Sequence, residues 1–149
     1  MTSPLNRAVR HSHLNDEGLK KLDDFPMIRW HYFDVERYIL KGSQAALDTG
    51  EKDEIRAMPI VTARGCVFRC TFCHFVFVDD PYRYRGPHAI VEELRRDIDL
   101  YNINYFFFWD DLTFASLNQV ERLMDAILDS GLKFYWTAAV RTDLFGNPK

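Results

Sequence analysis

The sequence predicts an α/β fold in which three parallel strands alternate with two helices, in the order β-α-β-α-β. Three observations lead to it. Short apolar runs over residues 57–63, 104–109 and 133–140 have the composition of buried strands. Segments with helical periodicity separate these runs. The connections between them are short, which is typical of units that form parallel sheets with right-handed crossovers.

The N-terminal third has a weaker pattern. Residues 1 to about 22 are polar and predict a loose arm, and residues 44–55 are charged and predict a loop. Between them, residues 34–40 predict a short helix that ends at Gly42. We therefore expect residues 1–56 to form an irregular arm and linker, and residues 57–149 to form the folded domain.

The two predicted helices have clear signals at their ends. Pro87 opens the first helix, and its charged residues are expected on the face opposite the apolar stripe. The stripe consists of Ile90, Val91, Leu94, Ile98 and Tyr101, and the charged face of Glu92, Glu93, Arg95, Arg96 and Asp97. Ser116 and Gln119 form a capping box that starts the second helix, and Gly131 ends it.

Polar residues follow each predicted strand. The first strand ends at Arg64-Gly65-Cys66, the second at Asp110-Asp111, and the third at Arg141-Thr142-Asp143. Because ligands of parallel α/β sheets bind beyond the carboxyl ends of the strands, we expect these residues to gather at one functional edge. The Tyr82–Arg85 stretch either lines that edge or is ordinary surface.

The three cysteines all lie within eight residues, with the spacing Cys66-x3-Cys70-x2-Cys73. Clustered thiols in an odd number indicate metal ligands in a reducing compartment rather than a disulfide framework. Thiolates suit zinc or iron–sulfur clusters, and three ligands leave one metal position open for a small molecule. A zinc site completed by His74 is the main alternative, and three buried apolar cysteines are another. The spacing favours an iron–sulfur cluster.

Composition and charge exclude several other classes. The chain carries a net charge of −3, which argues against a general nucleic-acid binder. No apolar run approaches the roughly 20 residues of a membrane span, and the polar N-terminus is unlike a secretory signal. The sequence therefore predicts a cytoplasmic protein without a membrane partner.

The cysteine segment, together with the aromatic Phe72 and the preceding strand, resembles the signature of the radical S-adenosylmethionine (SAM) superfamily. The resemblance implies a partial (β/α)6 barrel in which Cys66, Cys70 and Cys73 bind a 4Fe–4S cluster. It also implies that SAM chelates the fourth iron and is cleaved reductively to a 5′-deoxyadenosyl radical. An electron donor such as flavodoxin or ferredoxin is then expected. The fold class becomes a partial radical SAM barrel preceded by an irregular linker.

The same resemblance assigns the remaining candidate residues. Phe72 matches the aromatic residue near the adenine of SAM, and either Asp110 or Asp111 matches the position that contacts the methionyl amino group. The alternative for this pair is a cap on the turn into the next helix. Arg141 is a candidate for the SAM carboxylate, with an ion pair to Asp143 as its alternative.

Further segments resemble the branch whose radical SAM domain follows a cobalamin-binding domain. They include Arg64-Gly65-Cys66, Tyr84-Arg85, the stretch 108–114 and Trp136. No Asp-x-His-x-x-Gly motif occurs, so cobalamin is not expected to bind this chain directly.

Three strands do not complete a barrel, so a partner chain could supply the rest. The substrate, a small molecule or a peptide, stays open. The alternative function is a non-catalytic zinc or iron–sulfur module in electron transfer or assembly.

Overall fold

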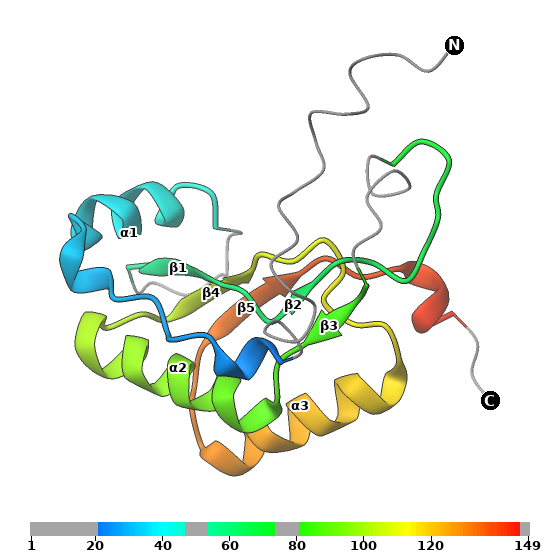
Figure 1. Cartoon of the computed structure of the whole chain (residues 1–149). Helices are drawn as coiled ribbons and strands as arrows, with labels where there is room; N and C mark the ends of the chain where they lie inside the picture. The colour runs from blue at the N-terminus through cyan, green and yellow to red at the C-terminus, as the bar shows by residue number, and fades with distance from the viewer. Residues whose placement is uncertain (1–20, 47–53, 74–80, 147–149) are drawn as a thin grey trace.

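The computed structural model describes residues 21–46, 54–73 and 81–146 and contains a three-stranded parallel sheet (Figure 1). Its strands are β1 (Ala57–Ile60), β4 (Tyr105–Phe108) and β5 (Tyr135–Ala138), in the order β1-β4-β5. In-register pairs such as Met58 with Phe106 and Phe106 with Trp136 fix the alignment. The predicted α/β class and the parallel β-α-β-α-β order are confirmed.

The two crossover helices are α2 (Pro87–Tyr101) and α3 (Leu117–Ser130), which lie below the sheet in Figure 1. Both ends of α3 follow the sequence signals. The Ser116 hydroxyl accepts a hydrogen bond from the Gln119 amide at 3.3 Å, and Gly131 ends the helix with φ of 68°. A left-handed backbone conformation at that position favours glycine, because glycine has no Cβ. The Ser116 cap and the Gly131 stop signal are confirmed, but the capping box is incomplete because the Gln119 side chain accepts from the Ala115 amide at 3.0 Å instead of from the Ser116 amide.

The hydrophobic core lies between the sheet and the helices. Phe106 on the central strand is completely buried, and the Phe134 ring meets its edge at a centroid distance of 5.4 Å. Leu94 of α2 and Leu123 of α3 belong to the same cluster. The continuous aromatic run of β4 follows from this position, because the central strand is buried along most of its length.

The charged face expected on α2 is only partly correct. Glu93 and Asp97 are 5% and 1% exposed, although the stripe assignment placed them in solvent. Glu93 pairs with Arg85, and Asp97 accepts a 2.8 Å hydrogen bond from Nε of Arg96. Helical periodicity alone did not reveal this burial because the α2 surface is covered by partners that lie outside the helix.

The expected N-terminal linker contains a helix that packs on the sheet. Two short 3-10 turns, Leu22–Asp24 and Trp30–Tyr32, precede α1 (Val35–Ser43). Figure 1 shows α1 above β1, and Ile39 on this helix is 1% exposed within the core cluster. The helix runs through Gly42 to Ser43 rather than ending at Gly42. At Gly42 a Cβ would lie 2.8 Å from the Ala57 carbonyl oxygen, so glycine permits close helix–strand approach there.

The first predicted strand is shorter than expected. β1 ends at Ile60, and residues Ala63–Arg64 form a separate strand, β2, that pairs antiparallel with β3 (Arg83–Tyr84). The Tyr82–Arg85 stretch therefore contains a short strand. The chain leaves the parallel sheet because the N–H groups of Thr62 and Ala63 donate to the Asp110 carboxylate instead of to a neighbouring strand.

Some sequence predictions fall on parts of the chain that the structure does not describe. These are the arm over residues 1–20, most of the loop over 44–55, and His74. The proposed domain boundary at residue 56 stays a prediction. None of the helices in the described ranges is long and apolar enough to cross a membrane.

Candidate functional site

The cysteine loop, residues 66–73, follows β2 at the carboxyl edge of the sheet. Gly65 precedes it with φ of 77°, a left-handed conformation that favours glycine. The Phe68 amide lies 3.4 Å from the Cys66 sulfur and donates to it, and the Cys73 amide donates to the Cys70 carbonyl at 3.0 Å. All three thiols are partly exposed and none is in a disulfide. The loop thus presents three free thiols over a short span.

The chemistry of this donor set suits a thiolate-bound metal, but the sulfurs are not assembled. Across residues 21–46, 54–73 and 81–146, no three His, Cys, Asp or Glu side chains are grouped closely enough to hold a metal ion. Two hydrogen bonds nevertheless point at sulfur, from the Phe68 amide to Cys66 and from Arg141 to Cys70. Donors of this kind stabilise negatively charged sulfur, so the residue types suit a metal cluster. The three sulfurs would have to come closer together to bind one.

Arg141 joins the end of β5 to the cysteine loop. Its Nε and Nη2 atoms donate to the two carboxylate oxygens of Asp143 at 2.9 and 3.0 Å, and Nη1 lies 3.6 Å from Cys70 Sγ. Its Cζ lies 3.8 Å from the centroid of the Phe68 ring. Hydrogen bonding to Asp143 raises the pKa of Arg141 and lowers that of Asp143. The ion pair weighed for Arg141 is therefore formed; its contact with SAM stays a prediction.

Asp110 accepts three hydrogen bonds at the carboxyl ends of the strands. Its two oxygens receive the Thr62 amide at 2.8 Å, the Thr62 hydroxyl at 2.5 Å and the Ala63 amide at 2.9 Å. The carboxylate thus ties the end of β4 to the turn after β1. The Asp110 carboxylate caps the turn after β1 and not, as the alternative had it, the turn into the next helix. Its contact with SAM stays a prediction.

Asp111 and Phe72 are the remaining candidates for SAM contact. Both are exposed, and the Phe72 side chain is 91% accessible to solvent. Neither side chain is brought against the cysteine sulfurs by a contact that assigns it a role. Their proposed contacts with SAM stay predictions.

Sequence reasoning missed the role of Arg85, which is 12% exposed. Its Nη1 donates to the Val61 carbonyl at 2.9 Å and also pairs with Glu93. The Arg85 amide donates to the Thr62 carbonyl at 2.9 Å. The side chain thus joins the end of β1 to the start of α2. The sequence signal that could have indicated this role is the opposite charge of Arg85 and Glu93. These residues are eight positions apart, whereas ion pairs along a helix are usually three or four positions apart.

Tyr82 holds the same loop against α3. Its hydroxyl donates to the Thr113 carbonyl at 2.8 Å and also lies 2.8 Å from Nε2 of Gln119. Burial raises the pKa of Tyr82 to about 12, so the hydroxyl stays protonated. The side chains of Tyr82 and Arg85 match neither possibility considered for the Tyr82–Arg85 stretch. Each of them instead connects two parts of the fold.

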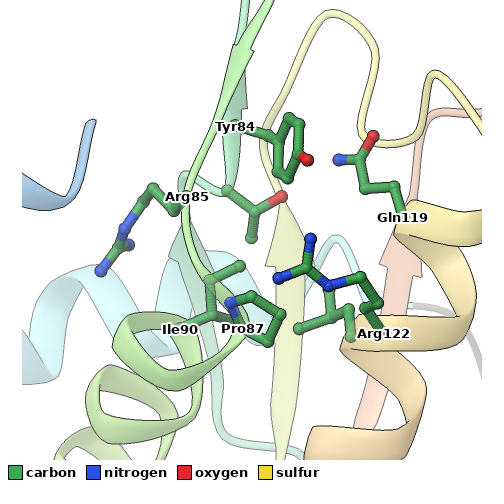
Figure 2. Close-up of a pocket in the computed structure, with 8 residues that line it drawn as sticks. Tyr84, Arg85, Pro87, Ile90, Gln119 and Arg122 are labelled. Carbon is green, nitrogen blue, oxygen red and sulfur yellow. The ribbon is translucent and has the colours of Figure 1, made fainter. Parts of the chain in front are cut away.

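A small recess opens between β3, the start of α2 and α3 (Figure 2). Figure 2 shows Tyr84 and Gln119 pointing toward each other across it, while Arg85 points away. Its volume of about 10 Å³ admits no more than a water molecule. Substrate or cofactor cannot be accommodated there without movement of the helices.

A larger cavity of about 440 Å³ lies between the N-terminal segment and the β2–β3 pair. Its apolar lining includes Phe25, Met27 and Ile28, and its charged lining includes Arg64, Arg83 and Glu93. This volume is typical of small-molecule pockets. Since Arg64 is only two residues from Cys66, the cavity adjoins the cysteine loop along the chain.

The comparison with known proteins identified one distant similarity. The chain is 31% identical over 114 residues to cytidylyl-2-hydroxyethylphosphonate methyltransferase of Streptomyces wedmorensis. The aligned region covers 75% of this chain and 21% of that enzyme, so the chain spans about a fifth of the length of the relative it matches. No protein-family model and no solved structure matches the chain.

Proposed function

We propose that this chain contains the N-terminal part of a radical SAM core domain, with Cys66, Cys70 and Cys73 as ligands of a 4Fe–4S cluster. The observation that carries the proposal is the position of three free thiols on one loop, beyond the carboxyl edge of a parallel sheet. Similarity to a methyltransferase supports an enzyme and favours methyl transfer as the reaction class. When bound, the cluster would supply the electron that cleaves SAM.

The residues of the chain have separate tasks in this proposal. The cysteine loop holds three irons and leaves the fourth open to SAM. Either the exposed Asp111 or Asp110, which already accepts three hydrogen bonds, would meet the SAM amino group. Phe72 is exposed and therefore able to stack on the adenine. An external reductant such as flavodoxin or ferredoxin would deliver the electron.

The proposal also includes a completing partner or segment for the sheet. Tyr135 and Trp136 on the outer strand β5 are 42% and 36% exposed, and Leu128 on α3 is 76% exposed. Further strand–helix units packed on this side would cover these residues and extend the sheet toward a barrel. They would also supply contacts to the substrate, which the chain's own residues leave undefined.

Anaerobic reconstitution with iron and sulfide tests the proposal. We expect about four irons per chain, and an electron paramagnetic resonance signal of the reduced protein that changes when SAM is added. Cys70→Ser should lose the SAM-sensitive cluster, whereas Thr71→Ser, a conservative change in the same loop, should keep it. Bound zinc without a cluster, and no response to SAM, would instead establish the non-catalytic metal-binding module.

A further inference from the structure

The guanidinium of Arg141 contacts three neighbours, although the side chain is 41% exposed. The edge that carries Nε and Nη2 faces Asp143, Nη1 faces the Cys70 sulfur, and the flat face lies over the Phe68 ring. The contact with Cys70 joins residues 71 positions apart, one in the loop that follows β2 and the other just after β5. A side chain held on three sides fixes the relative positions of what it touches.

We propose that Arg141 is a positioning residue that holds the cysteine loop against the end of β5 and directs an N–H donor at the Cys70 sulfur. The part of this inference that concerns a bound cluster rests on the proposed function. The loop-holding part does not, because it follows from contacts among the chain's own residues.

The local structure explains how Arg141 is oriented. The short 3-10 turn Thr142–Leu144 begins directly after it and brings Asp143 back toward the guanidinium. A bidentate carboxylate fixes the plane of the guanidinium, which then lies flat over Phe68 as a cation–π contact. Lysine has one compact ammonium group and cannot form the fork and the stacked face together.

The same arrangement would act on a bound cluster. Hydrogen bonds to cluster sulfurs and nearby positive charge are among the protein's means of setting a reduction potential. The Arg141 donor would favour the reduced, more negative state and so raise the potential. The bidentate pair with Asp143 limits the long-range field of Arg141, so the effect depends on the direct contact with Cys70.

Amide hydrogen exchange over residues 66–73 tests the loop-holding role in the full chain without metal. Arg141→Gln should accelerate exchange several-fold, and Arg141→Lys should also exceed the wild type because it lacks the fork. Arg95→Gln is the matched control, since Arg95 also bridges two elements by donating to the Ser130 carbonyl at 3.1 Å. Equal exchange in Arg141→Gln and the wild type, or equal acceleration in Arg95→Gln, would overturn the proposal.

The midpoint potential of the reconstituted protein tests the donor to Cys70. Arg141→Gln should lower the potential at unchanged iron content, while Arg95→Gln should leave it at the wild-type value. An unchanged potential in Arg141→Gln would refute the donor role. If the wild type takes up no iron, the proposed function fails, and the exchange experiment still decides whether Arg141 holds the loop.

Discussion

At the scale of single residues, Asp110 links the strand ends by accepting hydrogen bonds from two backbone amides and one hydroxyl. Bonds to a charged acceptor are worth more than neutral ones, and loss of the acceptor leaves buried donors without a partner. Thr62 and Ala63 are both nearly fully buried, at 2% and 1% exposure. The geometry of the candidate site therefore depends on this carboxylate even if it never touches a ligand.

Replacing Asp110 with alanine should lower the free energy of unfolding by about 2–4 kcal/mol, since three hydrogen bonds are lost together. The measurement is urea denaturation of the chain without metal. Asp111→Ala is the control, because this exposed neighbour makes none of those three bonds. Equal losses for the two variants would show that Asp110 does not stabilise the turn.

At the scale of secondary structure, the contact between α1 and β1 makes the N-terminal segment part of the fold. Ser43 at the end of α1 accepts a hydrogen bond from the Ala57 amide at 3.2 Å, and Arg56 pairs with Glu36 at 2.8 Å. Ile39 and Trp30 from the same segment enter the core cluster. The irregular linker expected from the sequence is thus partly an ordered layer beside the sheet.

Gly42→Ala should destabilise the chain by up to about 2 kcal/mol. Alanine favours a helix by about 1 kcal/mol over glycine, but overpacking against the fixed Ala57 carbonyl opposes this gain with about 1–3 kcal/mol. Thermal unfolding followed by circular dichroism provides the measurement. Lys41→Ala changes an exposed position of the same helix and should be nearly neutral. A stabilised Gly42→Ala protein would mean that α1 does not pack closely on β1.

At the scale of the whole molecule, Asp97 couples proton binding to folding. Its side chain is 1% exposed on α2, close to Arg96 and Glu93. Burial raises the pKa of Asp97 from 3.8 to about 6, despite the hydrogen bond from Arg96. Between those two values the folded chain binds this proton more tightly than the unfolded chain does, so Asp97 makes folding less favourable as the pH rises.

We therefore expect the Asp97 contribution to stability to increase as the pH falls from about 6 to about 4, by up to about 3 kcal/mol. Above that window, the cost of burying the charged carboxylate is fully present. The free energy of unfolding, measured across this range for the wild type and Asp97→Asn, should give two curves whose difference changes with pH. Asp99→Asn, at an exposed position of α2, is the matched control.

The sequence predicted much of the fold, because strong local signals and the final packing agree. The aromatic run at 104–109 became the central strand, and the helix from Pro87 to Tyr101 has the expected bounds. The exceptions are places where tertiary partners override local pattern. Glu93 and Asp97 look like solvated residues on a helix, and their burial is tolerable because Arg85 pairs with Glu93 and Arg96 pairs with Asp97.

The sequence by itself determined the alternation of strands and helices and the close spacing of the three cysteines along the chain, because periodicity and residue spacing are local properties. Tertiary structure alone decided which polar residues meet. It joined Asp110 to the turn after β1, and Arg141 to Cys70. These contacts form because parallel strands place their carboxyl ends at one edge, where residues distant in sequence come within hydrogen-bond reach.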